Sequence, residues 1–230
     1  MRVAIVALGP SGLQWPRLAE GLGDWRCQFD EVWGINGFAN VFQCTRGFAM
    51  DDVRVQEARA KAGNVKIRNL LEAYKKHPGP IYTSRAHPDY PSLVPYPLEE
   101  VVNSCGREYF NSTVAYAIAL AIHERAQSIA MFGADYSFPD KHVSEKGRAC
   151  CEFWLGVASA RGIKIGVASG STLMDANERT EVYGYDGVTI KREKDENGYV
   201  KFSFEDKPIP TAQEIESRYD KQAHLKQEAA

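Results

Sequence analysis

The sequence predicts an α/β fold: a Rossmann-like, mostly parallel sheet with helices on both faces, followed by a C-terminal β-hairpin and a tail helix. Short apolar strands alternate with helical stretches over roughly the first 170 residues, which is typical of a parallel sheet. From about residue 181, strands of alternating polarity flank the hairpin-type turn Asp195-Glu196-Asn197-Gly198. We therefore expect a Rossmann-like domain over residues 1–175 and an appendage of hairpin and helix over residues 176–230.

Composition excludes several classes of protein. A formal net charge of −2 argues against a strongly basic nucleic-acid-binding surface. No apolar run reaches the ~20 residues that span a bilayer, and Met1-Arg2 leads directly into a strand, unlike a signal peptide. The five cysteines are odd in number and form no C-x-x-C pair, so we expect reduced thiols and a cytoplasmic location.

The first strand and its turn are the most informative segment. The small and β-branched residues Val3–Ala7 predict a buried strand, which ends at Gly9-Pro10-Ser11-Gly12 before a helix over Leu13–Leu22. Backbone N–H groups at such a helix start suit a phosphate. The spacing matches neither the dinucleotide pattern nor the P-loop, and a glycine-shaped tight bend is the alternative interpretation.

Three further strands follow, and polar residues stand at the end of each. We expect strands at Glu31–Ile35, Gly47–Met50 and Ile81–Thr83, the first ending at Asn36 and the second at Asp51-Asp52. Residues 54–76 predict one amphipathic helix with Gly63-Asn64 as its weakest point. Four prolines within residues 84–99 predict a long surface loop without regular structure.

The next unit has the strongest pattern. Asn111-Ser112-Thr113 precedes an alanine-rich helix over Val114–Glu124, and a strand over Ser128–Phe132 ends in Gly133-Ala134-Asp135-Tyr136. A polar loop containing His142 precedes a helix over residues 145–161 and a last parallel strand over Ile163–Val167. Beyond the hairpin, the charged residues 211–230 predict a surface helix that frays at its end.

Ligands of open parallel sheets bind beyond the carboxyl ends of the strands. Polar and glycine residues that follow predicted strands are therefore candidate site residues: Gly9, Ser11, Asn36, Asp51, Asp52, Ser84, Arg85, Gly133 and Asp135. Asn and Asp also form turns and helix caps, and a helix cap is the leading interpretation of Asn111-Ser112-Thr113. His87 and His142 lie in predicted loops, where an imidazole can act as a general base. No H-x-H, H-E-x-x-H or D-x-D element indicates a metal.

The order of these motifs resembles the bacterial sialyltransferases that use CMP-sialic acid and the Rossmann-like domains related to them. Ala7-Leu8-Gly9-Pro10-Ser11 stands at the family's Gly-Asn-Gly-Pro-Ser turn, with Leu8 in place of the asparagine. Gly34-Ile35-Asn36-Gly37-Phe38 and Gly133-Ala134-Asp135-Tyr136 match later motifs, and His142 precedes Glu152-Phe153 as the family's catalytic histidine precedes its Glu-Phe. The resemblance covers roughly residues 1–175.

The resemblance implies a glycosyltransferase-like transferase that uses a nucleotide-linked donor, such as a CMP-sugar, without a metal. His142 would deprotonate an acceptor hydroxyl, and Asp135 would shape the nucleotide pocket. The residues implied in nucleotide binding are Gly9, Pro10, Ser11, Asn36, Asn111, Ser112, Thr113 and Gly133.

Three alternatives stay open. A pyrophosphokinase-like enzyme of this fold would use ATP and Mg²⁺, with Asp51, Asp52 and Asp135 as ligands. A viral DNA-base-modifying transferase would use a basic and aromatic surface on the hairpin, formed by Lys191, Arg192, Lys194, Tyr183, Tyr185 and Tyr199. A non-catalytic nucleotide-binding module would leave its histidine idle. The sequence does not select the donor, the acceptor or the oligomeric state.

Overall fold

The structure, a computed structural model, describes residues 1–37, 41–42, 44–137, 139–175, 184–185 and 187–218. The chain divides into two compact units, Met1–Asn177 and Glu178–Ala230.

The first unit contains a seven-stranded parallel sheet in the order β5-β4-β3-β2-β1-β6-β7. Its strands are β1 (Arg2–Val6), β2 (Glu31–Ile35), β3 (Arg46–Phe48), β4 (Ile81–Thr83), β5 (Leu93–Pro95), β6 (Ser128–Phe132) and β7 (Lys164–Val167). Its α-helices are α1 (Gln14–Leu22), α2 (Val53–Lys61), α3 (Val65–Lys76), α4 (Leu98–Cys105), α5 (Thr113–His123) and α6 (Lys141–Ala160). The expected Rossmann-like α/β fold is confirmed.

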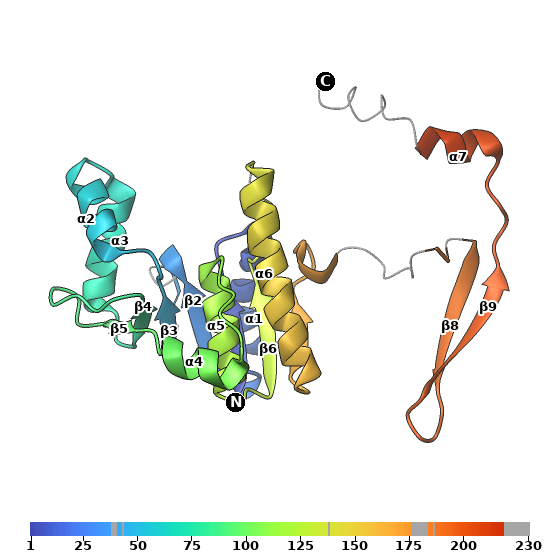
Figure 1. The fold of residues 1–230 in the computed structure, drawn as a ribbon, viewed down its shortest axis with the longest axis horizontal. Helices are drawn as coiled ribbons and strands as arrows, with labels where there is room; N and C mark the ends of the chain where they lie inside the picture. Colours follow the sequence, from blue (N-terminus) through green and yellow to red (C-terminus); the bar gives the residue numbers. More distant parts are fainter. Residues whose placement is uncertain (38–40, 43, 138, 176–183, 186, 219–230) are drawn as a thin grey trace. The chain divides into compact units, whose positions relative to one another are not determined.

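Alternate side chains of β1 enter two different cores, because successive residues of a strand point to opposite faces. Val3 and Ile5 pack with the alanine-rich α5 and with α6, whereas Ala4 and Val6 pack with Trp15 of α1. Helices therefore cover both faces of the sheet (Figure 1). The sheet grows from β1 toward β5 on one side and toward β7 on the other, so the boundary between β1 and β6 is its topological switch point.

Two expectations about this unit are wrong. The proline-rich segment holds β5 and leads into α4, where we expected no regular structure. Pro95 is tolerated because β5 is the edge strand, where a missing N–H removes no essential ladder bond. The single helix expected over residues 54–76 is two helices, because Gly63 adopts a φ of +97° and the Asn64 side chain caps α3 by accepting from the Ile67 N–H.

A third correction concerns α6, which begins at Lys141 rather than at residue 145. The Asp140 carboxylate accepts hydrogen bonds from the N–H groups of His142 and Val143, at 3.0 and 3.2 Å. Such an N-cap starts a helix at the next residue. His142 therefore lies in the first turn of a helix and not in a loop.

The second unit contains the expected hairpin and helix: β8 (Val188–Lys194), β9 (Val200–Asp206) and α7 (Ala212–Arg218). The two strands are antiparallel, with Val188 opposite Asp206 and Lys194 opposite Val200. The Asp195 carboxylate accepts from the N–H groups of Asn197 and Tyr199 and so fixes the turn. The rest of the expected tail helix lies outside the described residues.

Candidate nucleotide-binding site

A cavity of about 450 Å³ opens at the switch point of the sheet, beyond the ends of β1, β2 and β6. The N-terminus of α5 and the first half of α6 complete its walls; we call it the switch-point cavity. Of the ten site residues that the resemblance implies, eight line it: Gly9, Pro10, Asn36, Asn111, Ser112, Thr113, Gly133 and Asp135. The fold thus brings together residues from four separate segments of the chain.

The turn after β1 is closed around the carboxylate of Asp135. The Ser11 N–H donates to Asp135 Oδ2 at 2.6 Å, and the Ser11 hydroxyl donates to Asp135 Oδ1. The Gly133 N–H donates to Ser11 Oγ at 2.8 Å, and the Gly9 N–H donates to the Gly133 carbonyl at 2.8 Å. Because the side chains of Ser11 and Asp135 are almost fully buried, an internal carboxylate occupies the anion position that we expected a phosphate to take. Ser11 lies behind the lining of the cavity.

Glycines allow this close approach of two backbone segments. A Cβ on Gly9 would lie 2.6 Å from both Asp135 Oδ2 and the Gly133 carbonyl oxygen. Gly133 has a φ of +73°, and a Cβ there would lie 2.2 Å from the Ala7 carbonyl oxygen. The glycines of the first turn therefore have the tight-bend role that the sequence left as an alternative.

The N-terminus of α5 supplies donors that the first turn does not. Ser112 is the N-cap, and its hydroxyl accepts from the Ala115 N–H at 3.4 Å, as the sequence indicated. The first N–H groups of a helix have no partner inside the helix. Those of Thr113 and Val114 have none elsewhere among the described residues either, and both residues line the cavity. The positive end of an eleven-residue helix thus borders the cavity, which favours an anion there.

Asn36 contributes a polar group without a partner. It follows β2 with a φ of +54°, and its side-chain Oδ1 is buried without a hydrogen bond among the described residues. A buried acceptor left unpaired costs roughly 1–3 kcal/mol. A ligand N–H or O–H entering the cavity would remove that cost.

Tyr136 and Gly147 form a further wall of the cavity, and sequence reasoning missed Gly147. The Tyr136 hydroxyl contacts Ser112 Oγ at 2.9 Å and Cys151 Sγ at 2.7 Å. Burial raises the pKa of this hydroxyl, which therefore stays neutral. A Cβ on Gly147 would lie 2.3 Å from Tyr136 Cε1, so the glycine makes room for the ring. A glycine in the middle of a helix was the available signal, because it is unfavourable there without a packing reason.

His142 is exposed at the start of α6 and does not line the cavity, although its neighbour Val143 does. No side chain in the described part of the protein is hydrogen-bonded to its imidazole. The catalytic role of His142 stays a prediction.

Among the described residues, the three aspartates considered as metal ligands do not form a group with metal-ligand spacing. Asp135 is held by Ser11, and Asp52 caps α2 and pairs with Arg54. Asp51 lines a different cavity.

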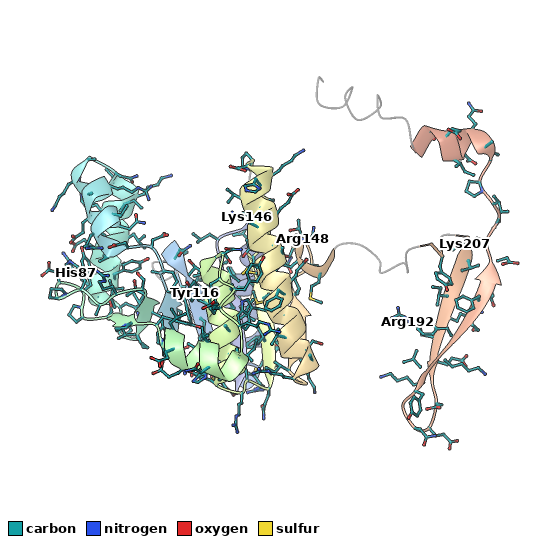
Figure 2. The ribbon with its side chains drawn as sticks, in the orientation of Figure 1. His87, Tyr116, Lys146, Arg148, Arg192 and Lys207 are labelled. Carbon is teal, nitrogen blue, oxygen red and sulfur yellow. The ribbon has the colours of Figure 1, made fainter. Side chains whose placement is uncertain are left out.

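One group of described residues has the spacing of metal ligands: Glu57, His87 and Asp89. A nitrogen of the His87 ring lies 4.0 Å from a Glu57 oxygen, and the other lies 3.9 Å from an Asp89 oxygen. Figure 2 shows His87 near α2 and α3, at the end of the sheet away from α6. This group is therefore separate from the switch-point cavity.

The hairpin residues considered for nucleic acid are mostly engaged with neighbours on the hairpin. Lys191 pairs with Glu205, the Arg192 guanidinium lies 5.7 Å from the centre of the Phe202 ring, and Tyr185 stacks on Phe204. Tyr199 and Lys194 are exposed, and Tyr183 lies outside the described residues.

No protein-family model matches the chain, and no curated protein matches it. Among solved structures, the chain is similar to the sialyltransferase CstII from Campylobacter jejuni, solved in complex with the substrate analogue CMP-3FNeuAc. The identity is 12%, the match covers 92% of this chain and 95% of that chain, and the TM-score is 0.44. This similarity is distant. In the described part of the chain, no helix combines the length and apolar character needed to cross a bilayer.

Proposed function

We propose that the protein is a transferase that binds a nucleotide-activated donor in the switch-point cavity and transfers a group to an acceptor hydroxyl. One observation carries the proposal: the unpartnered N–H groups at the start of α5 border the same cavity as the unpartnered Asn36 Oδ1. The first set suits a phosphate, and the second suits a hydroxyl or amino group of the attached nucleoside or sugar. A nucleotide with an attached group carries both chemistries.

In the proposed reaction, the bond between the donor's transferred carbon and the phosphate oxygen breaks, and the acceptor oxygen forms the new bond. The N–H groups of Thr113 and Val114 stabilise the negative charge that collects on the leaving phosphate. The acceptor's proton passes to the imidazole of His142. Binding both substrates beside each other supplies the orientation that such a transfer needs.

A pair of variants tests the phosphate position. Thr113 is the first residue of α5, where proline is well tolerated, and Ser112 before it has the extended backbone that a following proline favours. Thr113→Pro removes the N–H and the hydroxyl, whereas Thr113→Ala removes only the hydroxyl. We expect Thr113→Pro to weaken nucleotide binding by about tenfold more than Thr113→Ala, as measured by calorimetry.

The nucleotide is found first by thermal denaturation with CMP, UMP, GMP and AMP and their triphosphates, with and without Mg²⁺. We expect at least one nucleotide to raise the melting temperature. The proposal fails if none does, or if the two Thr113 variants bind the nucleotide equally.

A non-catalytic nucleotide-binding module is the second candidate, because His142 does not line the cavity. His142→Ala separates the two functions, with the exposed neighbour Lys141→Ala as its matched control. In a transferase, His142→Ala nearly abolishes release of free nucleotide from the donor in the presence of acceptor, while nucleotide affinity is retained. Unchanged release in His142→Ala would remove the histidine from the mechanism.

A further inference from the structure

A second cavity, of about 390 Å³, adjoins the switch-point cavity. It lies at the ends of β2, β3 and β4 beneath α2 and α3, and Leu8 and Asn36 line both cavities. These two residues therefore form a wall that the two cavities share. A ligand in the second cavity would lie directly beside a ligand in the first.

The inner part of the second cavity is built for a ligand with both apolar and hydroxyl-bearing surface. Val53, Leu70 and Leu93 contribute apolar wall. Thr83 is 1% exposed and lines this cavity with its short hydroxyl-bearing side chain. Asn36 Oδ1, on the wall shared with the first cavity, is buried without a hydrogen-bond partner among the described residues. Hydroxyl groups of a ligand can pair with both side chains.

The outer part of this cavity is positively charged. Arg59 from the last turn of α2 and Lys66 from the first turn of α3 line it, together with the single acid Asp51. Gln56 accepts from Arg59 at 3.0 Å and donates to Asp51 at 3.4 Å, so it lies between the opposite charges. Neither cation has a carboxylate partner in the described part of the chain. Two cations that face one acid leave a net positive lining.

We infer that the second cavity binds the acceptor, and that the acceptor is a small hydroxylated molecule bearing a carboxylate or a phosphate. This inference rests on the proposed function of the switch-point cavity. Arg59 and Lys66 bind the acidic group, since guanidinium and ammonium groups form charge-assisted hydrogen bonds with both kinds of anion. Thr83 binds a hydroxyl of the acceptor. Asn36 Oδ1 has two lone pairs, so it accepts a hydrogen bond from the acceptor on one side of the shared wall and from the donor on the other.

Three probes test this inference on the full-length chain: glucuronate, glucose 6-phosphate and glucose as the uncharged control. Binding is followed by amide chemical shifts at Asn36 and Thr83. We expect both acids, at millimolar concentration, to shift these amides more than glucose does. In Arg59→Gln/Lys66→Gln the affinity for the acids falls by about tenfold or more, and the weak binding of glucose is unchanged.

Lys61→Gln/Arg68→Gln is the matched control, because these exposed cations belong to the same two helices but line a different cavity. It should bind the acids as the unaltered chain does. The nucleotide-induced rise in melting temperature should persist in both double variants, which separates this test from the test of the proposed function.

Three results would overturn the inference. The first is equal acid binding by the two double variants. The second is no shift at Asn36 and Thr83 with either acid. The third is displacement of the acid by a nucleoside monophosphate, which would place the acidic group in the donor cavity.

Discussion

Replacing Gly133 with alanine should destabilise the first unit strongly, because two separate costs meet at that position. The φ of +73° is one that an L-residue adopts at a cost of about 1–2 kcal/mol. The new Cβ would also lie 2.2 Å from the Ala7 carbonyl oxygen and 2.7 Å from the Ala7 carbonyl carbon. Backbone on both sides must then move, and overpacking of this kind costs a further 1–3 kcal/mol or so. We expect a total loss of about 2–5 kcal/mol.

Gly106 provides the matched control. Its φ is +71°, and a Cβ there would meet no atom within 4 Å. Gly106→Ala should therefore carry only the conformational cost of about 1–2 kcal/mol. The difference between the two variants isolates the close approach of the β1 turn to the end of β6.

Urea denaturation followed by tryptophan fluorescence measures this difference. Trp15, Trp25, Trp33 and Trp154 all belong to the first unit, so the signal reports its unfolding alone. We expect the urea midpoint of Gly133→Ala to lie well below that of Gly106→Ala, with similar slopes. Equal midpoints would refute the reasoning, since the two backbones would then not be in the contact described.

The other predictions concern α6 and the cysteines. Gly147→Ala should destabilise the protein by roughly 1–3 kcal/mol, because the new Cβ would overlap the Tyr136 ring. Gly156→Ala on the same helix would meet no atom within 4 Å and should stabilise the protein by roughly 0.5–1 kcal/mol. Urea midpoints that shift in the same direction for both variants would contradict this. Cys27 is exposed and the other four cysteines are buried. A disulfide-exchange reagent should therefore modify one thiol quickly in the native chain and the other four only in urea. A second thiol that reacts quickly would show that one of the buried cysteines is accessible in the native chain. Burial raises the pKa of the Cys44 thiol from 9.0 to about 11. Between pH 9 and pH 11 the thiol ionises in the unfolded chain but stays neutral in the folded one, so the free energy of unfolding should fall across this range. Unfolding measured across this range should lose roughly 2–3 kcal/mol more in the unaltered chain than in Cys44→Ala, and equal losses would argue against a buried thiol.

Much of the sheet could be predicted from the sequence because buried parallel strands are short apolar runs bounded by turn residues. Glu31–Ile35, Ile81–Thr83 and Ser128–Phe132 begin and end where the pattern predicts. The β5 strand was missed because prolines argue against strands in general. Only its place at the edge of the sheet, which no local pattern contains, makes Pro95 acceptable.

The candidate site was predictable as a set of residues but not as a set of interactions. Residues at the ends of parallel strands must gather at one edge of the sheet, and five of the expected ones, Gly9, Pro10, Asn36, Gly133 and Asp135, do line one cavity. The partner of each polar group depends on contacts across the chain. Ser11 and Asp135 are 124 residues apart, and nothing near either one indicates that they bind each other. The second cavity was missed for the same reason, since Arg59 and Lys66 resemble ordinary surface cations in the sequence.

The carboxyl group of Asp135 fills the anion position of the β1 turn with a side chain of the protein itself. A free phosphate could enter that position only by displacing a covalently tethered competitor, whose local concentration no soluble ligand can match. Removing the competitor in Asp135→Ala would leave the Ser11 donors facing a hole of carboxylate size, in which formate could substitute for the lost group. A glycine-containing turn after the first strand thus binds an external anion only where no side chain of the protein occupies its backbone N–H donors. The side chain that follows the neighbouring strand, here Asp135, distinguishes a filled turn from an open one.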